Sequence, residues 1–155
     1  MLWCWLVHLQ RPLAAPGWDH LRSPATPGGD AQLTLAQSSK LSGSIIISTP
    51  QDVALIDARK GINMFKKVNV PVLGIVENMS YFICAKCHER HEIFSNGGAK
   101  KEAGNFETPF LGELPLDKNL RIYSDEGRPV CISDPESSIA STYLSIAKKI
   151  HGNLH

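Results

Sequence analysis

Three short apolar runs, each bounded by turn residues, give the chain its pattern beyond residue 40. They are GSIIIS at residues 43–48, VPVLGIV at residues 70–76 and PFLGEL at residues 109–114. Runs of this length with many β-branched residues are typical of buried strands in a parallel sheet. We therefore predict three strands, the second of which ends at a polar Glu77-Asn78 pair.

Small and apolar residues recur at helical spacing between the first two runs. They predict a helix over residues 51–67 with one buried face, made of Ala54, Ala58, Gly61, Ile62 and Phe65. Thr49 is the predicted N-cap, and Pro50 occupies the first helical position. Strand, helix and strand in this order form a right-handed βαβ unit with parallel strands.

Four further helices complete the predicted pattern. Three are short, over residues 31–37, 99–104 and 118–124, and the last begins after Asp134 as its cap. The apolar face of the last helix consists of Ile139, Tyr143, Ile146 and Ile150. The predicted fold class is α/β: a partial three-layer parallel sheet flanked by helices.

Residues 1–27, which we call the leader, differ from the rest. They contain all three Trp residues and four prolines, at positions 12, 16, 24 and 27. Prolines at this density prevent regular structure, so we predict a disordered, irregular leader of unknown role with a short helical turn near residues 3–9. Residues 28–155 form the predicted folded domain.

Composition narrows the class of protein. The 155 residues are 43% hydrophobic and 20% charged with a net charge of +1, which fits a soluble globular domain and excludes the basic surface of a nucleic-acid binder. No apolar run is long enough to span a membrane. Cys4 and Cys131 are isolated while Cys84 and Cys87 are paired, a pattern that favours free thiols in a reducing cytoplasmic location over a disulfide framework.

The candidate chemistry lies in Cys84-Ala85-Lys86-Cys87, on a loop beyond the second strand. A two-residue spacer lets both sulfurs turn toward one point, as in zinc sites, iron–sulfur clusters and redox dithiols. His88 and His91 could complete a zinc site within one chain, but we expect both to be surface residues. The other route to four ligands is a site shared by two chains on a symmetry axis. These residues leave zinc and iron–sulfur open, with a redox dithiol as a third alternative.

Several segments occur in a characteristic order: GDAQLTLAQ at 29–37, STPQD at 48–52, VENMS at 76–80, the CxxC pair, FSNGGA at 94–99 and LGELPLD at 111–117. In this order they resemble the Mrp/ApbC iron–sulfur carrier ATPases of the MinD-like P-loop group. The resemblance implies that Cys84 and Cys87 from each of two subunits hold a 4Fe–4S cluster in a homodimer, and that the cluster passes to apo iron–sulfur proteins. It also implies that Asn78 and the Pro115-Leu116-Asp117 loop contact the adenine of ATP.

The sequence departs from the family in the loops that bind the phosphates of the nucleotide. The sequence contains no G-x-x-x-x-G-K-[ST] loop, and only Pro27-Gly28-Gly29-Asp30 matches the switch loop. The chain therefore resembles the C-terminal part of such an ATPase, with weak or vestigial ATP binding and no expected hydrolysis. In the family fold, the strands that lead into the phosphate loop and the switch loop lie in the middle of the sheet, and this sequence has no counterpart of either. We therefore predict an unpaired edge on strand 44–48 or 70–76, and an aggregation-prone chain. A zinc-bridged interaction module and a non-functional remnant are the alternative functions.

Overall fold

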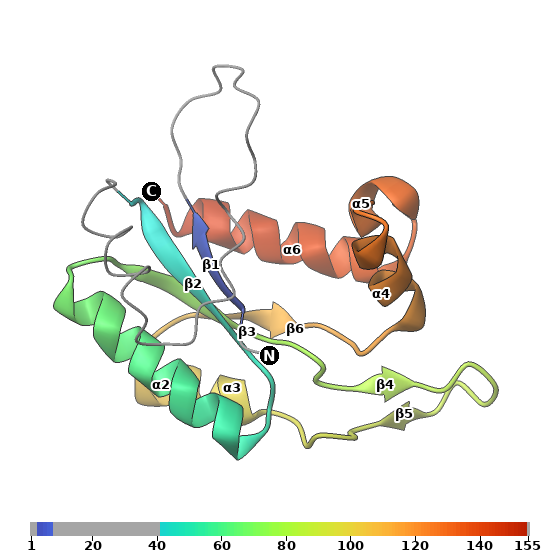
Figure 1. Cartoon of the computed structure of the whole chain (residues 1–155), viewed down its shortest axis with the longest axis horizontal. Helices are drawn as coiled ribbons and strands as arrows, with labels where there is room; N and C mark the ends of the chain where they lie inside the picture. The colour runs from blue at the N-terminus through green and yellow to red at the C-terminus, as the bar shows by residue number, and fades with distance from the viewer. Residues whose placement is uncertain (1–2, 8–40, 155) are drawn as a thin grey trace.

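A four-stranded sheet forms the centre of the molecule (Figure 1). The computed structural model describes residues 3–7 and 41–154. The strands β1 (Trp3–Val7), β2 (Gly43–Ser48), β3 (Val72–Glu77) and β6 (Phe110–Glu113) lie side by side in the order β1-β2-β3-β6. β2, β3 and β6 are parallel, as the βαβ pattern predicts, and β1 is antiparallel to β2.

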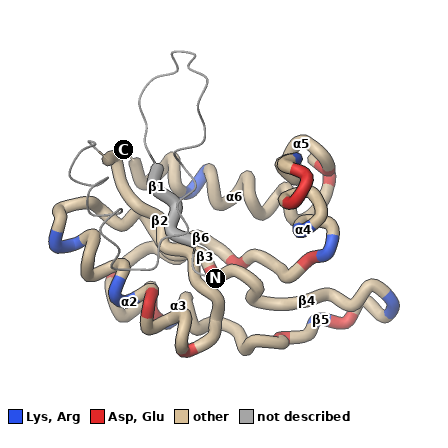
Figure 2. The backbone as a smooth tube through the Cα atoms, viewed as in Figure 1, with Lys and Arg blue, Asp and Glu red and all other residues tan. Residues whose placement is uncertain are grey.

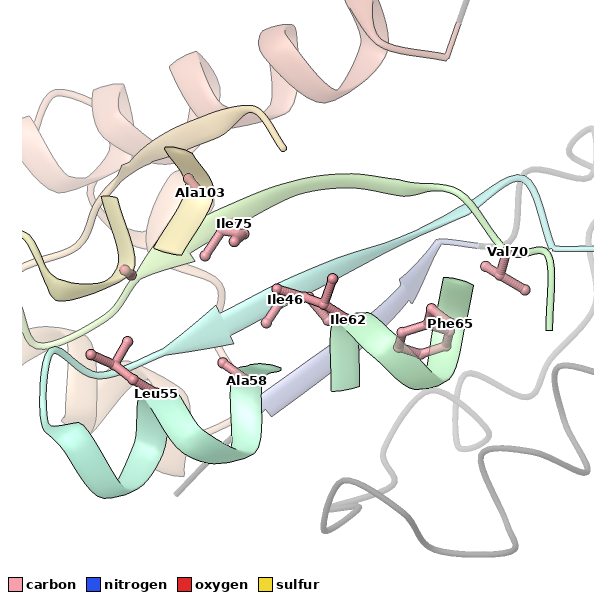
Figure 3. Close-up of a cluster of buried hydrophobic side chains, with 9 residues drawn as sticks. Ile46, Leu55, Ala58, Ile62, Phe65, Val70, Ile75 and Ala103 are labelled. Carbon is pink, nitrogen blue, oxygen red and sulfur yellow. The ribbon is translucent and has the colours of Figure 1, made fainter. Parts of the chain in front are cut away.

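Helices cover both faces of the sheet, which confirms the predicted three-layer α/β class. Helices α2 (Asp52–Lys67) and α3 (Gly98–Asn105) lie on one face, and α6 (Ser138–Gly152) lies on the other (Figure 1). The core under α2 and α3 consists of Ile46, Leu55, Ala58, Ile62, Phe65, Val70, Ile75, Ala99 and Ala103 (Figure 3). The core under α6 consists of Ile45, Leu73, Val76, Leu111, Leu114 and Ile146.

Two predicted helix caps are wrong. Helix α2 has Gln51 as its N-cap residue, and the Thr49 hydroxyl instead lies 3.5 Å from the Gln51 side-chain oxygen. Helix α6 is capped by Ser137, whose Oγ accepts a hydrogen bond from Ala140 N, whereas the Asp134 carbonyl accepts both the hydroxyl and the backbone N–H of Ser137. In both cases the chain turns once more before the helix begins, so the cap lies two or three residues later than predicted.

The first strand contradicts two predictions made for the leader and the sheet. Residues 3–7 form β1, with Cys4 opposite Ile46, and not a helical turn. β2 and β3 therefore each have a neighbour on both sides, so the unpaired edge predicted for strand 44–48 or 70–76 is wrong. The segment WCWLV is rich in aromatic and β-branched residues that favour strands, and the first proline follows only at position 12. The rest of the leader and the helix predicted at residues 31–37 lie outside the described residues.

Three short elements follow the strands at their carboxyl ends. A two-stranded ribbon of β4 (Phe82–Ile83) and β5 (Arg90–His91) projects beyond the end of β3 (Figure 1). Helices α4 (Lys118–Asp125) and α5 (Val130–Ser133) follow β6, and neither the ribbon nor α5 was predicted.

None of the described helices has the length and apolar character needed to cross a membrane. Lys and Arg are interspersed with Asp and Glu along the described chain in Figure 2.

Candidate functional site

The carboxyl edge of the sheet places three polar residues in one row. Ser48, Glu77 and Glu113 are register partners on β2, β3 and β6. Asn78 follows directly, and its backbone N–H donates to the Ser48 carbonyl over 2.7 Å. Open α/β sheets bind their ligands beyond this edge, so the predicted base-contacting residue Asn78 lies where a ligand is expected. Its side-chain oxygen accepts a hydrogen bond from Met79 N at 3.0 Å.

Glu77 has a fully buried carboxylate at the end of β3. One oxygen accepts the Ser80 hydroxyl at 2.7 Å and Gly97 N at 2.9 Å, and the other accepts Ala99 N at 2.7 Å. Gly97 is the N-cap residue of α3, with φ of +79°, and it has no side chain to cap the helix. The Glu77 carboxylate therefore supplies the missing cap and complements the positive end of the helix dipole.

The same network joins the two ends of the ribbon. Ser80 precedes β4 and Asn96 follows β5, and the Asn96 amide donates to the Ser80 hydroxyl over 2.7 Å. Since Ser80 also donates to Glu77, the two chain segments that enter and leave the ribbon are attached to the end of β3. The base of the ribbon is thus held by buried or half-buried hydrogen bonds.

The predicted Pro115-Leu116-Asp117 loop runs alongside the base of the ribbon. Ser80 N donates to the Leu114 carbonyl at 3.0 Å, and Leu116 N donates to the Tyr81 carbonyl at 2.7 Å. Pro115, between these two contacts, is buried. The Asp117 side chain accepts Leu120 N at 2.8 Å and so caps helix α4. Asp117 therefore has a structural role that the sequence analysis did not assign.

Cys84 and Cys87 lie in the turn at the tip of the ribbon. The turn is closed by Cys84 N donating to the Glu89 carbonyl at 3.0 Å and by His88 N donating to the Cys84 carbonyl at 2.9 Å. Cys84 is half-buried, Cys87 is exposed, and both are free thiols. The tip is therefore open for the two sulfurs to meet a ligand or another protein.

The turn also favours the thiolate form of Cys84. The backbone N–H groups of Cys87 and Lys86 and the thiol of Cys87 donate to the Cys84 sulfur, and these hydrogen bonds lower the pKa of the Cys84 thiol. Stabilising the charged form in this way is the usual means by which proteins prepare a cysteine to act as a metal ligand or nucleophile. The turn thus presents two thiols per chain, one of which, Cys84, has its pKa lowered.

The neighbouring histidines differ in their positions. His91 has a ring nitrogen close to both the Cys87 sulfur and a Glu89 oxygen, with all three atoms within 4.8 Å of one another. His88 is exposed in the turn with φ of +58° and does not belong to this group. His91 is exposed, as predicted, but it is adjacent to the thiol pair.

Comparison with known proteins assigns the chain to a family. The sequence profile of the NUBPL iron-transfer P-loop NTPases matches residues 22–151. The chain belongs to this family.

Curated relatives in this family are carriers of iron–sulfur clusters. The Escherichia coli K12 iron-sulfur cluster carrier protein is 49% identical over 151 residues, which cover 97% of this chain and 41% of the relative. The Dictyostelium discoideum iron-sulfur cluster transfer protein NUBPL is 47% identical over 146 residues, covering 92% of this chain and 45% of the relative. The chain thus spans less than half the length of these relatives.

Solved structures agree with the fold. The nucleotide-binding protein of Archaeoglobus fulgidus, in complex with ADP and with cobalt found in it, is 40% identical with a TM-score of 0.59, covering 70% of this chain and 44% of its own. The cell division ATPase MinD of Pyrococcus furiosus has a TM-score of 0.54 at 24% identity, covering 70% of this chain and 42% of its own, and shows the fold alone. The predicted resemblance to a MinD-like carrier family is confirmed.

The residues that the sequence analysis singled out fall into two separate places in the structure. The turn at the tip of the ribbon contains both Cys84 and Cys87, and Asn78 and Pro115 both lie at the carboxyl edge, following β3 and β6. Ligation of a cluster by the cysteines, and contact of Asn78, Pro115 and Asp117 with a nucleotide base, stay predictions.

The sequence analysis missed the buried network around Glu77. Glu77 was noted only as part of a polar pair, and Ser80 and Asn96 were not singled out. A charged residue at the end of an apolar run, followed about twenty positions later by Gly97-Gly98 at a helix start, was the available signal. That signal does not reveal the pairing, since it joins segments that are adjacent only in the folded chain.

Proposed function

We propose that two copies of this chain hold one 4Fe–4S cluster between them and deliver it to apo iron–sulfur proteins. The observation that carries the proposal is the position of Cys84 and Cys87 at the exposed tip of the ribbon, with the Cys84 thiol pKa lowered by hydrogen bonds from the turn. A cubane cluster takes four cysteine thiolates, and each chain supplies two, so a two-fold axis at the tip completes the set.

Exposure of the thiols also fits the transfer step. A cluster held at a projecting tip is accessible to the thiols of a recipient protein, whereas ligands buried in a core would not be. The recipients we propose are apo-proteins with cysteine ligands of their own, because thiolates exchange readily for thiolates around the same iron. A reducing compartment such as the cytoplasm keeps both partners' thiols free.

We further propose that the carboxyl edge contributes the base side of a nucleotide site. Asn78 and Pro115 lie at this edge, with Asp117 directly after the Pro115 segment. The sequence has no glycine-rich phosphate loop, and phosphate contacts are a major part of nucleotide recognition in P-loop proteins. Any affinity of this chain for ATP is therefore expected to be weak.

The test is anaerobic reconstitution of the full chain with iron and sulfide. We expect a coloured dimer with about four irons per pair of chains, from cubane stoichiometry. Cys84→Ser or Cys87→Ser should abolish the cluster, because each change removes two of the four ligands of a symmetric site. Cys131→Ser, on helix α5, is the matched control and should retain it. Cluster loss in Cys131→Ser but not in Cys84→Ser would overturn the assignment, as would a cluster on a monomer.

A further inference from the structure

The ribbon brings metal-ligand atoms together at its tip, and two of the residues that supply them, Glu89 and His91, are not used by the shared cluster. The sulfur of Cys87, a carboxylate oxygen of Glu89 and a ring nitrogen of His91 lie within 4.8 Å of one another. All three residues are exposed, so their side chains have room to adjust. Sulfur, imidazole nitrogen and carboxylate oxygen are the ligand types that zinc takes in proteins.

The pairing of the two ribbon strands explains why these side chains share one face. Phe82 lies opposite His91, and Cys84 N donates to the Glu89 carbonyl, which makes Cys84 and Glu89 the next cross-strand pair. Since side chains alternate between the faces of a strand, Cys84, Glu89 and His91 lie on the same face of the ribbon. Cys87 lies in the turn that joins the two strands, and its sulfur is within 4.8 Å of the ligand atoms of Glu89 and His91.

The opposite face of the ribbon is occupied by different contacts. The Arg90 guanidinium lies 4.0 Å from the centre of the Tyr81 ring and 3.3 Å from a Glu113 oxygen. These contacts fix Arg90 on the side away from His91. The ligand-type face is therefore free of the basic side chain that β5 also carries.

We propose that a single chain binds one divalent transition-metal ion, zinc or cobalt, through Cys84, Cys87, Glu89 and His91. Metal–ligand bonds of about 2.0–2.3 Å in a tetrahedron require ligand atoms roughly 3.3–3.8 Å apart. The three grouped atoms of Cys87, Glu89 and His91 lie within 4.8 Å of one another and need only small side-chain rotations to reach that spacing, and Cys84, on the same face of the ribbon, supplies the fourth ligand. The site is complete within one chain, unlike the shared cluster of the proposed function, and it uses Glu89 and His91 in place of the partner's thiolates. The two sites exclude each other because both need Cys84 and Cys87.

The experiment is a titration of the reduced, metal-free full chain with Co²⁺ under anaerobic conditions. The readouts are the sulfur-to-cobalt charge-transfer band, the visible bands of tetrahedral cobalt and the molar mass in solution. We expect one cobalt per chain on a monomer. His91→Ala should weaken cobalt binding by at least about tenfold, since even outer-shell partners of metal ligands cost that much when mutated.

Matched variants on the same ribbon provide the controls. His88→Ala removes a histidine that is outside the group, and Glu92→Gln removes the neighbouring carboxylate that faces Arg90, so both should bind cobalt like the wild type. Glu89→Gln should weaken binding as His91→Ala does. One cobalt per two chains, or equal affinity in His91→Ala and His88→Ala, would overturn the proposal.

Failure of this site can be told apart from failure of the shared cluster. A 4Fe–4S cluster with four thiolate ligands does not need His91, so His91→Ala should still assemble a dimeric cluster with iron and sulfide. If His91→Ala keeps the cluster and also keeps wild-type cobalt affinity, only the single-chain site is wrong. If the wild type binds cobalt as a monomer but forms no cluster, the single-chain site stands and the proposed carrier function is wrong.

Discussion

Substituting Glu77 by Gln tests the central hydrogen-bond network of the site. The carboxylate is fully buried and accepts three donors, the Ser80 hydroxyl and the backbone N–H groups of Gly97 and Ala99. A Gln side chain has the same shape but only one acceptor oxygen. If that oxygen keeps Ser80 and Gly97, its amide N–H₂ group faces the Ala99 N–H, which is buried and then has no acceptor.

The structure sets the size of the effect. A buried donor left without a partner costs about 1–3 kcal/mol, and hydrogen bonds to a charged acceptor are each about 1 kcal/mol stronger than those to a neutral one. Losing the negative charge at the N-terminus of α3 adds about 0.5 kcal/mol. Allowing for overlap between these contributions, we expect Glu77→Gln to lower the free energy of unfolding by about 3 kcal/mol.

Urea unfolding of the full chain, followed by far-UV circular dichroism, measures this loss. In a thermal melt followed by the same signal, the melting temperature should fall by roughly 6–12 °C, at 2–4 °C per kcal/mol for a chain of this size. Glu113→Gln is the matched control, because Glu113 is the register partner of Glu77 on β6 and forms only a surface ion pair with Arg90, worth about 0–1 kcal/mol. A loss for Glu77→Gln within about 0.5 kcal/mol of the control would refute this account of the carboxylate.

Three further predictions follow from the fold and the site. Gly98→Ala should destabilise the chain by about 1–3 kcal/mol in the same urea assay, because the new Cβ would lie 2.9 Å from the Pro50 carbonyl oxygen. Gly104→Ala in the same helix is the control: its Cβ meets nothing within 4 Å, so this change should be neutral or stabilising. Deleting residues 1–7 should expose the apolar β2 edge and cause association, seen by light scattering; a monomeric deletion variant would show that β1 does not protect β2. The purified chain should release no phosphate from Mg-ATP above background, and turnover abolished by Asn78→Ala would contradict this.

The strands show which parts of the fold local sequence can predict. β2 has the predicted boundaries, Gly43–Ser48, because an uninterrupted apolar run is bounded by turn residues on both sides. β3 begins two residues later than predicted, at Val72. Pro71 has no N–H to donate to a neighbouring strand and contributes only its carbonyl, which accepts Ser44 N at 2.8 Å. A proline inside a predicted strand thus shifted the boundary, as its chemistry requires.

In the candidate site too, the contacts between residues close in sequence were predictable and the long-range contacts were not. The proximity of Cys84 and Cys87 follows from their spacing in one turn and was predictable. The ribbon that carries them was not, because β4 and β5 have two residues each and no alternation of apolar and polar positions. The attachment of Glu77 to Gly97 and Ala99 joins residues about twenty positions apart, and no local pattern encodes such a pair.

The base and the tip of the ribbon differ in a way that matters for the two proposed metal sites, the shared cluster and the single-chain site, which use the same thiol pair. At the base, Glu77, Ser80 and Asn96 form side-chain hydrogen bonds that are buried or half-buried, and the Leu116 N–H binds the neighbouring segment. At the tip, backbone hydrogen bonds close the turn, while the side chains of Cys87, Glu89 and His91 remain exposed. The fold therefore fixes where the tip lies but not which ligands would complete the proposed metal site. In the two proposals, a second chain supplies thiolates and favours the cluster, whereas an isolated chain completes the site with Glu89 and His91. If both proposals hold, the concentration of the chain should decide which metal it binds.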